Sequence, residues 1–181
     1  MKKLFFSILI ATSATLSANA QNPIKGNYGY LYCHMSDRGE YTAYAVSRDG
    51  YHYEDILNGN QIFDPEIHAR IEGGTRDAYI TRSWNGKGYI MVTTDMCVRN
   101  YGIDLLKSKD LINWTSVTVD FRKGMSNFSD AATATPPYKD WSTINRVWAP
   151  QIFWDPSYQW SNGSRGGYMI YFSMLNRSEE Q

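Results

Sequence analysis

Asp77 is the residue of this chain whose type and position most suggest catalysis. It lies in the segment Gly74–Ile80, directly before two strand-like runs joined by Asn85-Gly86-Lys87-Gly88, a typical hairpin turn. A sheet can hold an acid beside a strand start rigidly while its carboxylate faces a pocket. Such a fixed carboxylate suits general acid–base chemistry, including cleavage of glycosidic bonds, which requires two carboxyl groups at a defined separation.

A structural role for the same side chain is the alternative. Asp77 follows Arg76 and precedes a turn, so an ion pair with Arg76 or a cap on the hairpin would also explain it. From these residues alone, the structural role is the more common one.

The elements that must position Asp77 are strands. Short aromatic and β-branched runs separated by Gly, Asn, Asp and Ser dominate the chain after Gln21, and helical periodicity is almost absent. This pattern predicts an all-β fold with a long loop from Lys123 to Asn145. The expected strands are Gly29–Met35, Tyr41–Ser47, Ala78–Ser83, Gly88–Thr94, Ile103–Ser108, Ser116–Phe121, Gln151–Trp154 and Tyr168–Met174.

An internal repeat indicates how these strands are organised. Gly29-Tyr30 and Gly88-Tyr89 each lead to a Ser–basic–Asp turn and then, after three residues, to Tyr53 or Trp114. A third copy opens at Gly167-Tyr168. Such a unit buries its faces only by stacking on its neighbours, which favours a β-propeller over a β-sandwich. The 161 residues from Gln21 to Gln181 hold two to three blades, so we expect an N-terminal part of a longer propeller.

The N-terminus has the three parts of a secretory signal peptide. Lys2 and Lys3 precede a short apolar run, and Ala18-Asn19-Ala20 forms a cleavage site, so residues 1–20 are expected to be removed and residues 21–181 to belong to the folded domain. We expect a periplasmic or extracellular protein without a membrane span. Removing two lysines leaves 16 basic against 18 acidic residues, which argues against a nucleic-acid partner.

Cysteines and metal ligands give little additional information. Cys33 and Cys97 fall in or beside strand-like runs, so each is more often a small buried hydrophobe than half of a disulfide, although export would permit the bond. The sequence has no zinc spacing, phosphate loop or nucleophile elbow. We therefore expect no cofactor and no metal, and no pattern supports a structural calcium ion on the propeller axis.

Several segments together resemble glycoside hydrolase family 43. They are Arg76–Ile80 with Gly88–Asp95, Ser108–Trp114, and Val147–Asp155 ahead of Gly166–Met174. The resemblance covers most of the chain after residue 20. It implies a five-bladed propeller that acts on arabinose- or xylose-containing carbohydrate such as arabinan, arabinoxylan or xylo-oligosaccharides.

The resemblance also implies roles for individual residues. Asp77 matches the general base of an inverting mechanism, with Ala78 where proline is commoner, while Asp64-Pro65-Glu66-Ile67 is a competing match. The general acid is expected beyond residue 181. Further candidates for substrate binding are Arg76, Asp95, Trp148 and Gln151.

Gln151 departs from the family pattern. It stands where an aspartate is common, and an uncharged amide cannot raise the pKa of a neighbouring acid by repulsion. The sequence thus predicts an exported glycosidase, with a non-catalytic carbohydrate-binding propeller and a structural or protein-binding propeller as alternatives.

Overall fold

The protein is built from antiparallel sheets. The computed structural model describes residues 29–63, 74–96, 101–121 and 144–176, and these contain no α-helix. No helix in those ranges is long and apolar enough to cross a membrane. The expected all-β class is confirmed. The strands are β1 (Tyr30–Met35), β2 (Thr42–Ser47) and β3 (Tyr53–Asp55) in the first sheet, β4 (Gly74–Arg82), β5 (Tyr89–Met96), β6 (Gly102–Ser108) and β7 (Trp114–Asp120) in the second, and β8 (Ile144–Gln159) and β9 (Arg165–Asn176) in the third.

Some sequence-based expectations fall outside the described residues. These are the signal peptide, the Asp64–Ile67 motif, Cys97 and nearly all of the long loop after Lys123.

Every strand expected from the sequence is present, but several are longer than predicted, among them β4, β8 and β9. β4 begins at Gly74 instead of Ala78, and β8 runs from Ile144 to Gln159 instead of from Gln151 to Trp154. Asp and Pro are poor strand residues, so the pattern seemed to break at Asp77 and Pro150. Both strands continue through these positions because each contains a β-bulge that accommodates the unfavourable residue.

The Ser–basic–Asp turns have the same structure in the first two sheets. Ser47 Oγ donates to Asp49 Oδ1 at 3.0 Å, and Ser108 Oγ donates to Asp110 Oδ1 at 3.0 Å. Each aspartate also accepts from the backbone N–H groups two and three residues later. The repeat seen in the sequence is therefore a repeat of hydrogen bonds.

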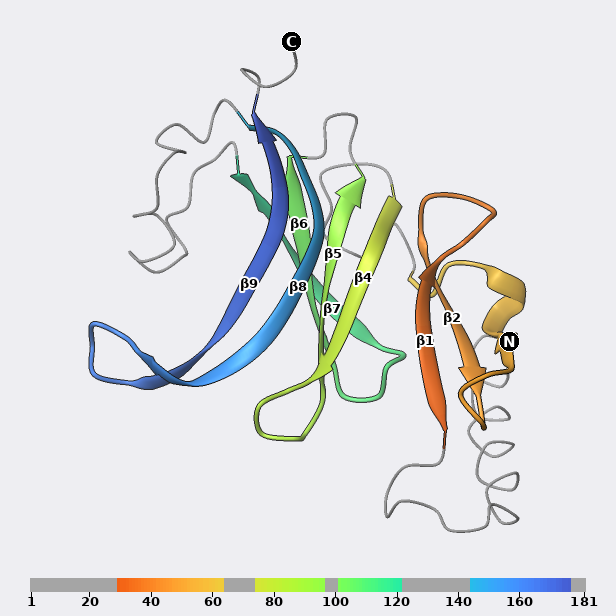
Figure 1. Cartoon of the computed structure of the whole chain (residues 1–181), viewed down its shortest axis with the longest axis horizontal. Helices are drawn as coiled ribbons and strands as arrows, with labels where there is room; N and C mark the ends of the chain where they lie inside the picture. Colours follow the sequence, from red (N-terminus) through yellow and green to blue (C-terminus); the bar gives the residue numbers. More distant parts are fainter. Residues whose placement is uncertain (1–28, 64–73, 97–100, 122–143, 177–181) are drawn as a thin grey trace.

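The three sheets pack face to face in chain order (Figure 1). A first core lies between the first and second sheets, and a second core lies between the second and third. The first core contains Tyr44, Ile56, Phe63, Met91, Leu106 and Trp114, and the second contains Ile103, Phe121, Ile144 and Val147. The middle sheet thus buries opposite faces against its two neighbours, which is the stacking expected of repeated units.

Cys33 is a free thiol packed against the first core. Burial raises its pKa to about 12, which keeps the thiol protonated and unreactive. Cys33 is therefore a partly buried side chain that packs as a small hydrophobe.

The Asp110 turn gives a pH-dependent prediction. Desolvation raises the pKa of Asp110, but hydrogen bonds from Asn113, Ile112 and Ser108 outweigh it and lower the pKa to about 2, against an ordinary 3.8. Between these values the unfolded chain binds more protons than the folded chain, so stability falls as the pH falls from about 4 toward 2. We expect Asp110→Asn to lower the free energy of unfolding by about 1 kcal/mol at pH 7. It should also make the loss of stability between about pH 4 and pH 2 shallower in urea titrations.

Asp37→Asn is the matched control, because Asp37 is an exposed turn acid that accepts no hydrogen bond from the described residues. Identical pH slopes for wild type and Asp110→Asn would contradict the prediction.

Candidate functional site

Asp77 lies inside β4, not at its start as the sequence suggested. The pairing of Arg76 with Thr94 and of Tyr79 with Val92 leaves Asp77 and Ala78 opposite the single residue Thr93, which defines a β-bulge. The φ angle of Asp77 is 55°, in the left-handed region that non-glycine residues seldom occupy. Backbone strain of this kind concentrates at functional sites, where it directs one side chain away from the regular alternation of the strand.

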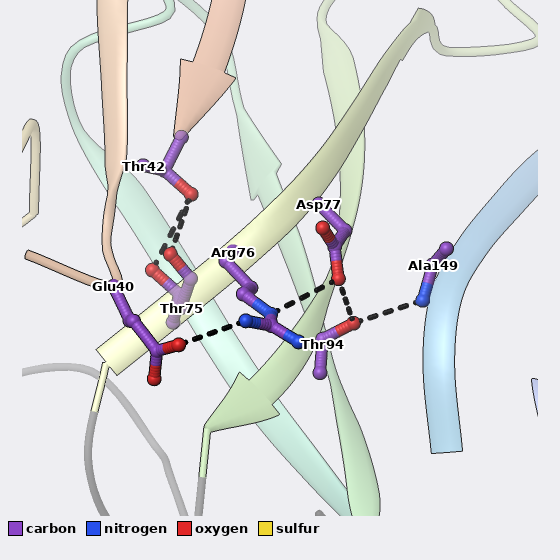
Figure 2. A network of polar contacts seen from close by, with 7 residues as sticks. All are labelled: Glu40, Thr42, Thr75, Arg76, Asp77, Thr94 and Ala149. Carbon is purple, nitrogen blue, oxygen red and sulfur yellow. Dashed lines mark hydrogen bonds and ion pairs between the residues drawn. The ribbon is translucent and has the colours of Figure 1, made fainter. Parts of the chain in front are cut away.

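A hydrogen-bonded chain holds the Asp77 carboxylate (Figure 2). Thr94 Oγ1 donates to Asp77 Oδ2 at 2.9 Å, and the backbone N–H of Ala149 donates to Thr94 Oγ1 at 2.9 Å. Thr94 is fully buried, whereas the Asp77 side chain is 32 % exposed. The carboxylate is therefore open to solvent on one side and fixed, on the other, to a hydroxyl that also contacts the third sheet.

Arg76 connects this carboxylate to the first sheet. Its Nε lies 3.4 Å from Asp77 Oδ2, and its Nη1 donates to Glu40 Oε1 at 2.8 Å. Nearby, Thr42 Oγ1 donates to the carbonyl of Thr75 at 2.9 Å. The ion pair considered from sequence thus exists, and Arg76 serves as a partner of two carboxylates. Both direct partners of Asp77, Thr94 and Arg76, belong to the second sheet, and they in turn contact Ala149 of the third sheet and Glu40 in the β1–β2 turn.

A second bulge occurs at the equivalent position of the third sheet. Ala149 and Pro150 stand opposite Phe172, and the φ angle of Ala149 is 46°. The position is the same relative to the tyrosine of the repeated Gly-Tyr pair. Asp77 lies five residues before Arg82, which pairs with Tyr89. Ala149 likewise lies five residues before Trp154, which pairs with Tyr168. The Arg76–Tyr79 and Trp148–Gln151 segments are therefore the same structural feature in successive sheets, and Gln151 corresponds to Tyr79 rather than to Asp77.

Trp148 and Gln151 flank this second bulge on one face of the third sheet. Their strand partners, Ser173 and Tyr171, are two residues apart, so both pairs point to the same side. The Tyr171 hydroxyl donates to Gln151 Oε1, and the Arg146 guanidinium lies over the Trp148 ring at 5.5 Å. This bulge contacts the Asp77 network through the backbone N–H of Ala149, and the side chains of Trp148 and Gln151 take no part in that hydrogen bond.

The structure places Thr94, and not Asp95, in contact with Asp77. Asp95, a sequence candidate for substrate binding, lies within β5 opposite Thr75 and is fully buried. A direct contact with a sugar would require the residues around it to move. Thr94, which the sequence analysis did not single out, makes the contact with Asp77 because neighbouring residues of a strand point to opposite faces. A threonine in a strand gives no sequence signal for such a role.

Among the residues that the structure describes, no three His, Cys, Asp or Glu side chains gather as a metal site would require. The chemistry that the arrangement itself offers is that of an oriented, solvent-accessible carboxylate.

Comparison with known proteins identifies the family. A family related to glycoside hydrolase family 43, described as a probable glycosyl hydrolase domain, matches residues 26–181. The chain belongs to this family. An alpha-L-arabinofuranosidase of Bifidobacterium longum subsp. longum is 24 % identical over 151 residues, which cover 76 % of this chain and 12 % of the relative. The match therefore spans a small part of that protein's length. No solved structure matches the chain.

The position of Thr94 in the hydrogen-bonded chain can be tested by removing its hydroxyl. Thr94→Val keeps the shape of the side chain but leaves Asp77 and the Ala149 N–H each without this partner. We expect the free energy of unfolding to fall by about 1–2 kcal/mol in chemical denaturation. Thr94→Ser retains the hydroxyl and should recover most of the loss. Equal stability of the Val and Ser variants would show that Thr94 acts through packing alone.

Proposed function

We propose that the protein is an exported glycoside hydrolase with Asp77 as its general base. The observation that carries the proposal is the carboxylate at a left-handed bulge, exposed to solvent and fixed by Thr94 and Arg76. Membership of a family of probable glycosyl hydrolase domains supports the reaction class. A turn acid with a purely structural role would not need a strained backbone or partners that themselves bind neighbouring sheets.

The two carboxylate oxygens of Asp77 have different surroundings, which suits different roles in the proposed reaction. Both recorded contacts, from Thr94 and from Arg76, go to Oδ2. Oδ1 is then the oxygen that would accept a proton from a nucleophilic water. In the proposed inverting reaction this water attacks the anomeric carbon, and a separate general acid protonates the leaving oxygen on the opposite side. We assign the general acid to none of the described residues.

The proposed substrates are arabinose- or xylose-containing polysaccharides and oligosaccharides. The support is the resemblance to glycoside hydrolase family 43 and the similarity to a protein named alpha-L-arabinofuranosidase. Trp148, with a half-buried ring on the same strand as Ala149, and the exposed Gln151 are proposed to line the sugar site. The signal-peptide pattern at residues 1–20 supports a periplasmic or extracellular location.

The proposed architecture is a five-bladed β-propeller to which this chain contributes the first two to three blades. Equivalent Ser–Asp turns, equivalent bulges and the stacking of the three sheets in chain order support it. In a propeller the first strand of each blade lines the central axis, and β4 and β8 are the strands that carry the two bulges.

Replacing the base tests the proposal directly. We expect Asp77→Asn to lower kcat on aryl α-L-arabinofuranosides or β-D-xylosides by about 10²- to 10⁴-fold, because Asn cannot take up the proton. Asp110→Asn is the matched control, since it makes the same change at an exposed turn of the same sheet, and it should keep wild-type turnover. Wild-type turnover by Asp77→Asn would remove Asp77 from the mechanism.

The stereochemistry of the product tests inversion. If Asp77 activates water in a single displacement, the first sugar released should have the anomeric configuration opposite to that of the substrate. Proton NMR of the reaction mixture, recorded before mutarotation, measures this. A product of retained configuration would require a covalent intermediate and would contradict the role of Asp77 as base.

A carbohydrate-binding propeller without catalysis is the second candidate. The observation favouring it is Gln151, which accepts a hydrogen bond from Tyr171 and supplies no carboxylate. Retention of arabinan or arabinoxylan by the whole protein without any hydrolysis would favour this function over the first.

A further inference from the structure

Aromatic side chains gather at the ends of the second and third sheets, away from Asp77. They come from the β4–β5 turn, from β8 and the turn after it, and from β9. We call these five residues the aromatic platform: Trp84, Trp154, Tyr158, Trp160 and Tyr168. None of them has a part in the proposed reaction.

The centre of the platform is a stack of rings that spans two sheets. The rings of Trp84 and Trp154 are nearly parallel, 19° apart, with centroids 5.4 Å from each other. Tyr168 packs edge-on against Trp154 at 5.0 Å, and its hydroxyl accepts a hydrogen bond from the Trp84 backbone N–H at 2.9 Å. Ring packing and a hydrogen bond therefore hold Trp84 in one orientation.

The outer part of the platform is fixed in a similar way. Tyr158 packs edge-on against Trp160 at 5.1 Å, and Trp160 Nε1 donates to the carbonyl of Gly166 at 2.7 Å. Gly166 has a φ angle of 82°, and a Cβ there would lie 2.2 Å from Cζ2 of Trp154. The backbone at this position lies directly against the indole, so only glycine fits without movement of the stack.

The platform remains open to solvent despite this order. Trp84 is 63 % exposed and Trp160 is 40 % exposed. Trp154 covers one face of the Trp84 indole, so much of the remaining exposed area belongs to the opposite face. Large exposed rings that are already immobilised lose little entropy when they bind a partner. Flat indole faces suit sugar rings, which present C–H patches between their hydroxyl groups, because Trp combines an apolar face with an N–H donor.

The platform is separate from the Asp77 site. Trp84 follows Asp77 by seven residues along the chain, a path of at most roughly 23 Å at about 3.3 Å per residue. Both hairpin turns, β4–β5 and β8–β9, lie at the lower end of the molecule in Figure 1. A short substrate bound at Asp77 would not reach the platform, whereas a polysaccharide chain could occupy both.

We propose that the aromatic platform is a second carbohydrate-binding surface, which holds a polysaccharide by stacking of its sugar rings on Trp84 and Trp160. The class of sugar rests on the proposed function: it is the arabinose- or xylose-containing polymer that the enzyme would cleave. The platform keeps the protein on an insoluble or extended polymer and does not alter the reaction at Asp77.

The test uses the intact protein in native gels with and without arabinan or arabinoxylan. Binding is measured in an Asp77→Asn background so that hydrolysis does not alter the polymer. We expect Trp84→Ala to weaken retention about tenfold, a change that corresponds to the loss of one ring contact. Trp84→Phe, which keeps a smaller ring in the stack, should bind with intermediate affinity and guards against misfolding of the Ala variant.

Tyr51→Ala is the matched control. Tyr51 is 87 % exposed and makes no ring contact with the residues that the structure describes, so its removal should leave retention unchanged. With Asp77 intact, Trp84→Ala should also hydrolyse small aryl glycosides at the wild-type rate.

Three outcomes would overturn the proposal: wild-type retention of both Trp84 variants, equal losses in Trp84→Ala and Tyr51→Ala, or a parallel loss of activity on aryl glycosides. If the protein hydrolyses aryl glycosides but its retention does not depend on Trp84, the platform alone would be contradicted. Trp84-dependent binding in a protein that hydrolyses nothing would contradict the proposed reaction alone.

Discussion

Each sheet of this protein carries apolar side chains on both faces, and the cost of leaving them in water determines the rest of the structure. The second sheet satisfies this constraint best, with Met91 and Leu106 packed toward the first sheet and Ile103 packed toward the third, although Val117 on its outer strand stays exposed. Apolar side chains on the outward faces of the two end sheets remain exposed, among them Tyr32 on the first and Phe153 on the third. Stacking of repeated sheets therefore both builds the cores and brings β4 beside β8, which is what allows Ala149 to reach Thr94.

The candidate site depends on the bulge at Asp77, where the backbone departs from regular strand geometry. A regular β4 would alternate through Asp77 and Ala78 without the left-handed angle at Asp77. The bulge costs conformational energy, and the contacts from Thr94 and Arg76 offset part of that cost. The same contacts orient the carboxylate, so the stability of the bulge and the geometry of the candidate base cannot be varied independently.

The sequence predicted the strands and the repeat because both have strong local causes. Alternating β-branched and aromatic residues indicate strands, and the Ser–basic–Asp pattern encodes hydrogen bonds to the next few N–H groups. The bulges were not predictable, since a two-against-one pairing depends on the partner strand and leaves no mark at Asp77 or Pro150 except an apparent strand break. The burial of Asp95 and the contact of Thr94 with Asp77 depend on the register of β4 against β5, so they were not predictable either. The aromatic platform was also missed, because its members are distant in sequence and abundant aromatics suit cores as well as surfaces.

The two equivalent bulges have a consequence for how such a protein could diversify. The same backbone geometry occurs in successive sheets with Asp77 at one position and Ala149 at the other. Each of the two bulges can display a different side chain without any change in the surrounding strands. A single substitution of Ala149 would therefore place a new functional group beside Thr94 while the strands that present it stay intact.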